Sequence, residues 1–197
     1  MRPGRAVPRL PGVRRTSRAL GTFTLRPLDP FDDAELVHGW AARPGTDLGP
    51  VGGARLQDVE RKCMAIAAHR NHDAFIGLYD GEPAFLMERY DPTETELKGL
   101  YEAEPGDVGM RLLLAPAVAP PQGFGSAAIT TVMEALFADP SVRRVLVGPD
   151  GRADAVHALH RAVGFEVIRE SAGPEKCALL GACTRERFQA ITAGGPR

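Results

Sequence analysis

The segment 123–126, Gly-Phe-Gly-Ser, is the part of the sequence best suited to hold a phosphate group. It follows a short apolar run, 112–115, that is typical of a buried strand, and it precedes a stretch, 129–137, with apolar residues at helical spacing. Glycines let a backbone approach a ligand closely, and the first N–H groups of a helix face an anion placed there. An ordinary strand–helix turn explains the segment equally well, since it lacks the lysine of a P-loop and the third glycine of a dinucleotide fingerprint.

The elements that must position this loop alternate along the chain. The Asp80-Gly81 pair is typical of a tight hairpin turn, and Gly164 is placed to end a helix. Hydrophobic periodicity predicts strands at 23–28, 74–79, 82–90, around 111, 144–147, 165–170 and 176–183, and helices at about 33–42, 56–69, after 126 and 153–163. This order predicts a mixed sheet covered by helices.

Length and composition fit one globular domain. The chain has 197 residues, of which 44% are hydrophobic and 25% charged, and no apolar run approaches the length needed to cross a membrane. Residues 1–28 contain seven arginines and no acidic residue, so the rest of the chain carries a net charge of about −8 although the total is −1. This distribution argues against nucleic acid as the main partner of the folded part.

The two ends are predicted to lie outside the folded domain, which we expect to span 22–191. Residues 1–21 are rich in Arg, Pro and Gly and predict a disordered tail, and residues 192–197 predict a frayed end. The cysteines, Cys63, Cys177 and Cys183, are odd in number and form no C-x-x-C pair. They favour a reducing cytoplasm, with the thiols acting as small core residues.

The order of elements, with a glycine loop after the fourth strand, resembles the GNAT N-acyltransferase fold. Gly123 and Gly125 match the glycines of the family's Gln/Arg-x-x-Gly-x-Gly/Ala loop, although Pro120 stands at its first position. The segment 159–165, Leu-His-Arg-Ala-Val-Gly-Phe, is similar to the family's Leu-Tyr-x-x-x-Gly-Phe. The resemblance implies an α/β (α+β) fold with a mixed, mostly antiparallel central sheet of about seven strands flanked by four helices. It also implies that the loop cradles the pyrophosphate of acyl-coenzyme A.

A narrower resemblance covers nearly all of residues 22–190. It is to the siderophore-biosynthesis acyltransferases, which acylate N-hydroxylysine, N-hydroxyornithine or N-hydroxycadaverine. The segments that carry this resemblance are 38–40 (His-Gly-Trp), 80–88 (Asp-Gly-Glu-Pro-Ala-Phe-Leu-Met-Glu), 90–92 (Tyr-Asp-Pro), 106–110 (Gly-Asp-Val-Gly-Met), 136–140 (Leu-Phe-Ala-Asp-Pro), 149–150 (Pro-Asp) and 176–180 (Lys-Cys-Ala-Leu-Leu).

The chain departs from that narrower family at several positions. Arg111 stands where the family usually has a histidine on the fourth strand, and Gly148 stands in place of the glutamate of Glu-Pro-Asp. Ala153 replaces an asparagine, and Leu48-Gly49 replaces Phe-Trp. We expect the fold and the coenzyme site to survive these changes, which fall on the acceptor pocket and on the groups that handle protons.

The resemblance assigns roles to individual residues. Asp150 is the carboxylate of the matching motif, and His160 takes the place of the tyrosine that protonates the leaving thiolate, which a histidine can do near neutral pH. A turn aspartate and a helix-surface histidine are the alternative interpretations. Backbone N–H groups of the strand after Arg111 are candidate oxyanion donors. The predicted coenzyme-binding residues are Leu112, Leu114, Gly123, Phe124, Gly125 and Ser126.

The acceptor is predicted to contact His38, Trp40, Glu88 and Arg111. Trp40 is also a natural core residue. Arg111 cannot act as a base because it stays protonated, but its planar fork can hold a carboxylate or a phosphate. A salt bridge from Arg111 to Asp107 or Asp150 is the other interpretation. The remaining histidines, His69, His72 and His157, have no chemical context in the sequence, and the histidine spacing predicts no metal.

The resulting hypothesis is a cytoplasmic, bacterial N-acyltransferase that uses acetyl-CoA or succinyl-CoA. The acceptor would be an N-hydroxylated diamine or amino acid in the biosynthesis of a hydroxamate siderophore or a related specialised metabolite. A GNAT enzyme with another amine or a hydrazine as nucleophile is one alternative, and a degenerate, non-catalytic GNAT domain is another. We expect a monomer or homodimer that binds small molecules, with neither nucleic acid nor membrane as a partner.

Overall fold

The computed structural model describes residues 14–17, 20–41, 55–95, 97–116, 121–150, 154–172 and 177–194. The chain divides into two compact units, one made of residues 1–88 and 112–121 and the other of residues 89–111 and 122–197. Strands β4 (Glu82–Tyr90) and β5 (Asp107–Leu114) each contribute residues to both units.

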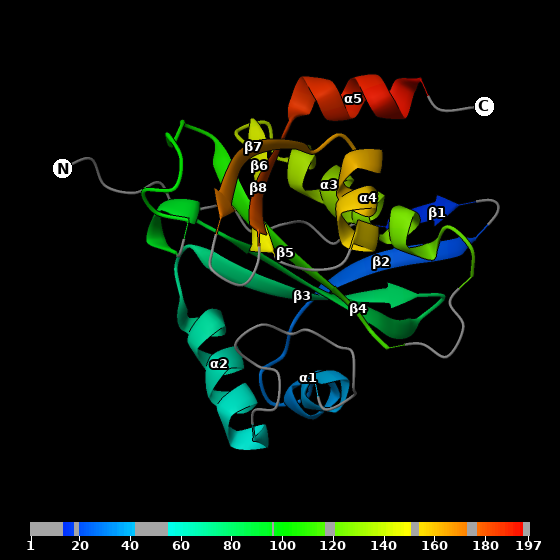
Figure 1. The fold of residues 1–197 in the computed structure, drawn as a ribbon. Coiled ribbons are helices and arrows are strands. Elements are labelled where there is room, and N and C mark those ends of the chain that lie inside the picture. The colour runs from blue at the N-terminus through cyan, green and yellow to red at the C-terminus, as the bar shows by residue number, and fades with distance from the viewer. Residues whose placement is uncertain are drawn as a thin grey trace. The chain divides into compact units, whose positions relative to one another are not determined.

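The first unit contains strands in the order β1-β2-β3-β4 (Figure 1). Strand β1 spans Arg14–Ser17, β2 spans Gly21–Pro27 and β3 spans His72–Tyr79, and the β1–β2 and β2–β3 pairs are antiparallel. Asp80 and Gly81 connect β3 to β4 with positive φ angles of 49° and 92°. This geometry is the one that a two-residue hairpin turn requires, so the hairpin predicted from this dipeptide is confirmed.

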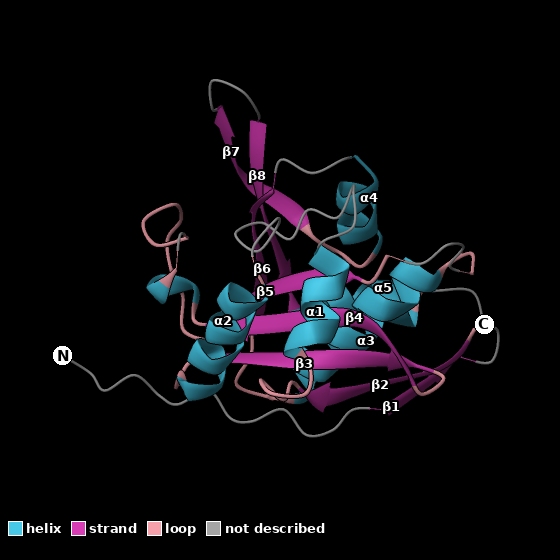
Figure 2. Ribbon diagram, turned by 90° about the horizontal axis from the view of Figure 1, so that it is seen from below, coloured by secondary structure: helices cyan, strands magenta, loops and turns pink. Residues whose placement is uncertain are grey.

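Two helices, α1 (Ala34–Ala41) and α2 (Leu56–Ala68), cover one face of these strands (Figure 2). The apolar positions of both helices point inward because they recur every three or four residues. Together with strand residues they form one buried cluster, which includes Val37, Trp40, Val59, Cys63, Ile66, Ile76 and Leu86.

The second unit contains strands in the order β5-β6-β8-β7. Strand β6 (Arg144–Asp150) is parallel to β5, β8 (Cys177–Thr184) is antiparallel to β6, and β7 (Glu166–Ala172) is antiparallel to β8. Figure 2 shows β7 and β8 running side by side. The strands in the two units therefore give the mixed, mostly antiparallel arrangement that the sequence predicts.

Helix α3 (Phe124–Ala138) is the central helix of the second unit, because ten of its fifteen residues are buried. Helix α4 (Asp154–Ala162) follows β6 and ends before Gly164, whose φ of 104° confirms the predicted glycine stop. A fifth helix, α5 (Arg185–Ala193), packs Phe188 against Phe137 of α3 with ring centroids 5.4 Å apart. A short 3-10 turn at Pro92–Glu94 follows β4.

The described residues contain eight strands and five α-helices, one more of each than the sequence predicts. The extra strand, β1, lies inside the segment 1–21 that we expected to be a disordered tail, and it pairs with β2 from Arg14↔Thr24 to Ser17↔Gly21. The extra helix, α5, continues to Ala193 and so enters the predicted frayed end. Residues 1–13 and 195–197 lie outside the described ranges.

Two of the three cysteines occupy the core. Cys63 belongs to the core of the first unit and Cys183 to the second, and both are buried free thiols. Burial raises the pKa of the Cys183 thiol to about 12, so it is protonated and unreactive near neutral pH. The side chain of Cys177 lies outside the described part of the structure.

Candidate functional site

The predicted anion-binding loop opens helix α3 as expected. Gly123 is the N-cap residue with a left-handed φ of 85°, and its carbonyl accepts the first helical hydrogen bond, from the N–H of Ala127 at 2.9 Å. The cap makes no side-chain hydrogen bond, and the first turn contains no acidic side chain. Phe124 is buried, Gly125 is half-buried and Ser126 is exposed. The start of α3 therefore presents backbone donors and the positive end of the helix dipole at a solvent-accessible position.

The pairing between β5 and β6 covers only part of both strands. It runs from Asp107↔Arg144 to Met110↔Val147, and β6 then bulges between Val147 and Asp150 where it pairs with β8. Leu112 and Leu114, two of the predicted coenzyme-binding residues, follow on β5 and belong to the first unit.

A cavity of about 260 Å³ lies in the second unit beside helix α4. Its apolar walls come mainly from β6, β7 and β8, and two histidines from α4 border it. The lining residues are Val147, Gly148, His157, His160, Arg161, Phe165, Glu166, Val167, Leu179 and Gly181. Gly181 keeps this space open, since a Cβ there would lie 2.9 Å from Cγ2 of Val147. The predicted acid His160 is thus at a cavity rather than on an open helix surface.

His160 is held in place by the residues that follow it. Its carbonyl accepts hydrogen bonds from the N–H groups of Val163 and Phe165, and its ring lies 5.1 Å from the ring of Phe165. His157, one helical turn earlier, borders the same cavity. Sequence reasoning assigned His157 no role. The signal that could have found it is the three-residue spacing to His160, which puts both imidazoles on one helix face.

Asp150 is the last residue of β6 and pairs with Leu179 of β8. The backbone is therefore strand rather than turn at this position. Its carboxylate lies outside the described part of the structure, so the proton-accepting role stays a prediction.

Arg111 lies on β5 with its guanidinium carbon 5.6 Å from the ring centre of Tyr90. The predicted alternative partner Asp107 instead forms a two-point ion pair with Arg144, with both oxygen–nitrogen distances at 2.8 Å. Tyr90 is a residue that sequence reasoning did not select. It is buried, and no local pattern reveals that its ring and Arg111 meet, because the contact depends on strand register.

Three predicted acceptor residues belong to the first unit. Trp40 is buried in the core, and His38 is half-buried in the last turn of α1. Glu88 is only 3% exposed, and its carboxylate lies 3.5 Å from Nζ of Lys62 and 3.2 Å from Nε2 of His72. A buried carboxylate requires such partners. Trp40 therefore has the structural role in the core that the sequence also suggested. Glu88 has a structural role as well, which the sequence alone did not indicate.

In the described ranges, no group of three His, Cys, Asp or Glu side chains lies close enough together to hold a metal ion. None of the described helices is both long and apolar enough to span a membrane.

A family described as an acetyltransferase (GNAT) domain matches residues 29–172, which is well over half of the chain. Among curated proteins, the lysine N-acyltransferase MbtK of Mycobacterium sp. (strain MCS) is 28% identical over 160 residues, covering 81% of this chain and 61% of that protein. The chain thus matches about three-fifths of that relative's length. The aminoglycoside N(6')-acetyltransferase type 1 of Klebsiella pneumoniae is 26% identical over 137 residues, covering 68% of both.

Solved structures share the fold. An uncharacterized protein from Bacillus halodurans has a TM-score of 0.85 at 20% identity, covering 94% of this chain and 96% of its own. The aminoglycoside acetyltransferase AAC(6')-Ib in complex with ribostamycin and coenzyme A has a TM-score of 0.76 at 23% identity, covering 88% and 99%.

Proposed function

Because the chain belongs to the family of acetyltransferase (GNAT) domains, we propose that it is an acyl-CoA-dependent N-acyltransferase. The observation that carries this proposal is the family match together with an exposed helix start at Gly123, the place where an acyl-CoA pyrophosphate would bind. Gly123, Gly125 and Ser126 would supply backbone donors to the pyrophosphate. Structural relatives solved with coenzyme A support the same assignment.

The proposed reaction transfers the acyl group from the thioester to a nitrogen of the acceptor. The neutral nitrogen attacks the thioester carbonyl, the C–N bond forms and the C–S bond breaks. A backbone N–H group of β5 would stabilise the oxyanion, and Asp150 would accept the proton that the nitrogen loses. His160, at the wall of its cavity, would protonate the departing thiolate.

For the acceptor we propose an N-hydroxylated diamine or amino acid, with acetyl or succinyl as the acyl group. The 28% identity to a lysine N-acyltransferase and the siderophore-type segments in the sequence support this choice. A hydroxylamine nitrogen is far less basic than an alkyl amine and is neutral at pH 7. Such an acceptor needs no strong base, which suits a chain with Arg111 at a position where a histidine would be expected.

A second candidate acceptor is an ordinary amine such as that of an aminoglycoside. The observation in its favour is the match to an aminoglycoside N(6')-acetyltransferase, which covers equal shares of both proteins. Two further hypotheses remain for the diverged site. The acceptor could be a hydrazine, or the domain could bind a ligand without turnover.

Release of coenzyme A distinguishes these candidates. The full chain is incubated with acetyl-CoA or succinyl-CoA and a panel containing N-hydroxylysine, N-hydroxycadaverine, lysine, kanamycin and a hydrazine, and free thiol is measured. We expect the highest kcat/KM with an N-hydroxylated acceptor. Preference for kanamycin would support the aminoglycoside-type function, and coenzyme A binding without any turnover would support the non-catalytic domain.

A further inference from the structure

The cavity beside α4 runs from an exposed mouth to a buried floor. Three of its lining residues, Arg161, Glu166 and Val167, are exposed and mark the mouth. Val147 and Phe165 are only 6% and 4% exposed and mark the floor. All the lining residues belong to the second unit, so the cavity is formed within one compact part of the chain.

The floor is apolar, and glycines leave it open. A Cβ at Gly181 would crowd both floor side chains, since it would lie 2.9 Å from Cγ2 of Val147 and 3.7 Å from Cδ1 of Phe165. Gly148 lines the cavity as well and adds no side chain to it. An occupant that reaches the floor therefore meets the carbon atoms of Val147 and Phe165, and an apolar group is favoured there.

The charged groups of this cavity lie at its mouth and have partners. Oε1 of Glu166 is 2.8 Å from Nη1 of Arg187, and Nε of Arg161 donates a hydrogen bond of 3.3 Å to the carbonyl of His157. An ammonium or carboxylate group pushed down to the floor would lose its hydration among apolar side chains, which costs much free energy. An occupant that ends in a methyl group does not have this cost.

The volume of the cavity sets the length of the occupant. A methylene group is close in size to a water molecule, whose share of the liquid is about 30 Å³, so a space of about 260 Å³ has room for roughly six to eight carbons. His160, the proposed acid, borders the same cavity. The acyl carbonyl carbon is bonded directly to the sulfur that His160 would protonate. The acyl chain therefore fits the cavity by position, by size and by its lack of charge, whereas the acceptor carries ionised ends.

We propose that this cavity is an acyl-chain pocket that binds straight, uncharged chains of about six to eight carbons more tightly than acetyl or succinyl groups. The inference rests on the proposed acyltransferase function and specifies its donor as a medium-chain acyl-CoA. Val147 and Gly181 would set the depth of the pocket, and Val167 the width of its mouth. Each methylene that leaves water for such a site improves binding about fourfold until the pocket is full.

A series of acyl donors tests the pocket. Calorimetry on the full chain, without acceptor, gives the dissociation constants of acetyl-, butyryl-, hexanoyl-, octanoyl- and decanoyl-CoA. We expect affinity to rise about fourfold per added methylene from acetyl to octanoyl and to level off at decanoyl. Succinyl-CoA has the chain length of butyryl-CoA but ends in a carboxylate, so it should bind more weakly than butyryl-CoA.

Two pairs of variants tie the chain-length dependence to the cavity. Val147→Ala deepens the floor and should move the plateau to longer chains, whereas Val145→Ala, at a buried position two residues earlier on β6 and outside the cavity lining, should not. Val167→Trp narrows the mouth and should bring the octanoyl-to-acetyl affinity ratio close to one. Ile168→Trp is its control, because Ile168 is the next residue of β7, is similarly exposed and does not line the cavity.

The outcomes separate this inference from the proposed function. Equal affinities from acetyl to octanoyl, equal binding of succinyl-CoA and butyryl-CoA, or an unshifted plateau in Val147→Ala would overturn the pocket. A change in acceptor affinity in place of acyl-CoA affinity in Val147→Ala would also overturn it, since the cavity would then hold the acceptor. Release of coenzyme A that does not depend on chain length would keep the proposed function and remove the pocket. Chain-length-dependent binding with no release from any donor would keep the pocket in a domain that does not transfer acyl groups.

Discussion

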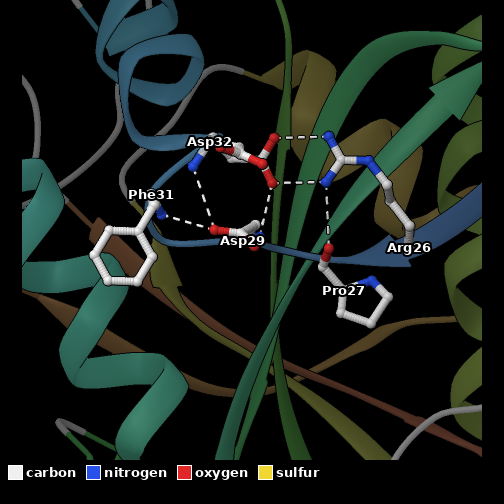
Figure 3. A network of polar contacts seen from close by, with 6 residues as sticks. Arg26, Pro27, Asp29, Phe31 and Asp32 are labelled. Atoms are coloured by element: carbon white, nitrogen blue, oxygen red, sulfur yellow. Dashed lines mark hydrogen bonds and ion pairs between the residues drawn. The ribbon is translucent and has the colours of Figure 1, made fainter.

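Arg26 and Asp33 form a two-point ion pair that ties strand β2 to the start of helix α1. Figure 3 shows the Arg26 guanidinium directed at this carboxylate, beside Asp29. The guanidinium donates to both carboxylate oxygens of Asp33, at 2.6 and 2.7 Å, and the N–H of Asp29 donates to one of them at 2.8 Å. Asp33 is nearly fully buried, whereas the Arg26 side chain is 40% exposed. The pair fixes the helix that presents the candidate acceptor residues His38 and Trp40.

Replacement of Asp33 by asparagine should destabilise the protein by about 1–3 kcal/mol, since it removes the charge-assisted bonds and leaves Arg26 without its carboxylate. Burial raises the pKa of Asp33, but the bonds from Arg26 and Asp29 outweigh it and hold the pKa below the ordinary value of 3.8. The stabilisation is therefore present above about pH 3.8 and lost as the pH falls through the folded-state pKa. Urea unfolding of wild type and Asp33→Asn should converge at low pH. Asp32→Asn, a change at the exposed neighbouring carboxylate, is the control. It should cause a much smaller loss of stability and a much smaller change in the pH dependence of unfolding.

Arg185 at the start of α5 should be a second stability determinant. Its guanidinium donates to the carbonyls of Phe137 at 2.6 Å, Val142 at 2.6 and 3.1 Å, and Asp139, and it stacks over the Phe137 ring at 5.2 Å. Arg185→Ala removes all of these donors and should cost roughly 2–3 kcal/mol, or about 5–10 °C in melting temperature. Glu186→Ala, at the exposed next position of the same helix, should shift the transition by no more than about 2 °C. Equal shifts in the two variants would contradict this role for Arg185.

The pairing of strand β1 with β2 predicts that part of the N-terminal segment contributes to the stability of the fold. A chain that begins at Arg14 should unfold at the wild-type temperature, because it keeps the whole β1–β2 pair. A chain that begins at Leu20 loses this pair and should be less stable by about 1–2 kcal/mol, with β2 left as an exposed edge that promotes aggregation. Thermal unfolding and light scattering of the two chains check this. The same melting temperature and the same light scattering in both chains would instead support the expectation that the whole segment 1–21 is dispensable.

The elements that the sequence predicted well are those with a local cause. The Asp80-Gly81 hairpin follows from two positive φ angles, and the apolar stripe of α2 from its helical spacing. The two missed elements have weak local signals. In α5 only Phe188 is buried, and its contacts come from Arg185 bonding to carbonyls far away in the chain. Strand β1 lies in an arginine-rich segment and is specified by pairing with β2.

The candidate site also contains features that the sequence could predict and others that it could not. The glycine loop at α3 was predictable, since a helix start is a local feature. The Tyr90–Gly109–Arg111 contact was not, because β4 and β5 meet through a long connection and their register cannot be counted from sequence. Asp33 shows the same limit, since no local pattern in the sequence indicates that its carboxylate pairs with Arg26.

The glycine loop should be essential for coenzyme binding. Gly125→Val adds a branched side chain where the backbone must approach a pyrophosphate, and we expect calorimetry to show at least a 100-fold loss of acetyl-CoA affinity. Ala138→Val adds the same kind of side chain at the exposed far end of α3 and should retain wild-type affinity. Unchanged affinity in Gly125→Val would remove the loop from the coenzyme site.

The two histidines of α4 should share the protonation of the leaving thiolate, because both border one cavity from one helix face. Glutamine keeps a polar side chain but cannot donate a proton as an imidazolium does, so His157→Gln and His160→Gln isolate this role. We expect each single variant to lower kcat by about tenfold or less, since the other histidine remains, and the double variant to lower it by about 100-fold or more. KM for acetyl-CoA should change little. His69→Gln, at an exposed histidine in the first unit, serves as the control and should match the wild type. Wild-type kcat in the double variant would show that this cavity takes no part in the reaction, and the thiolate would then leave by way of another donor.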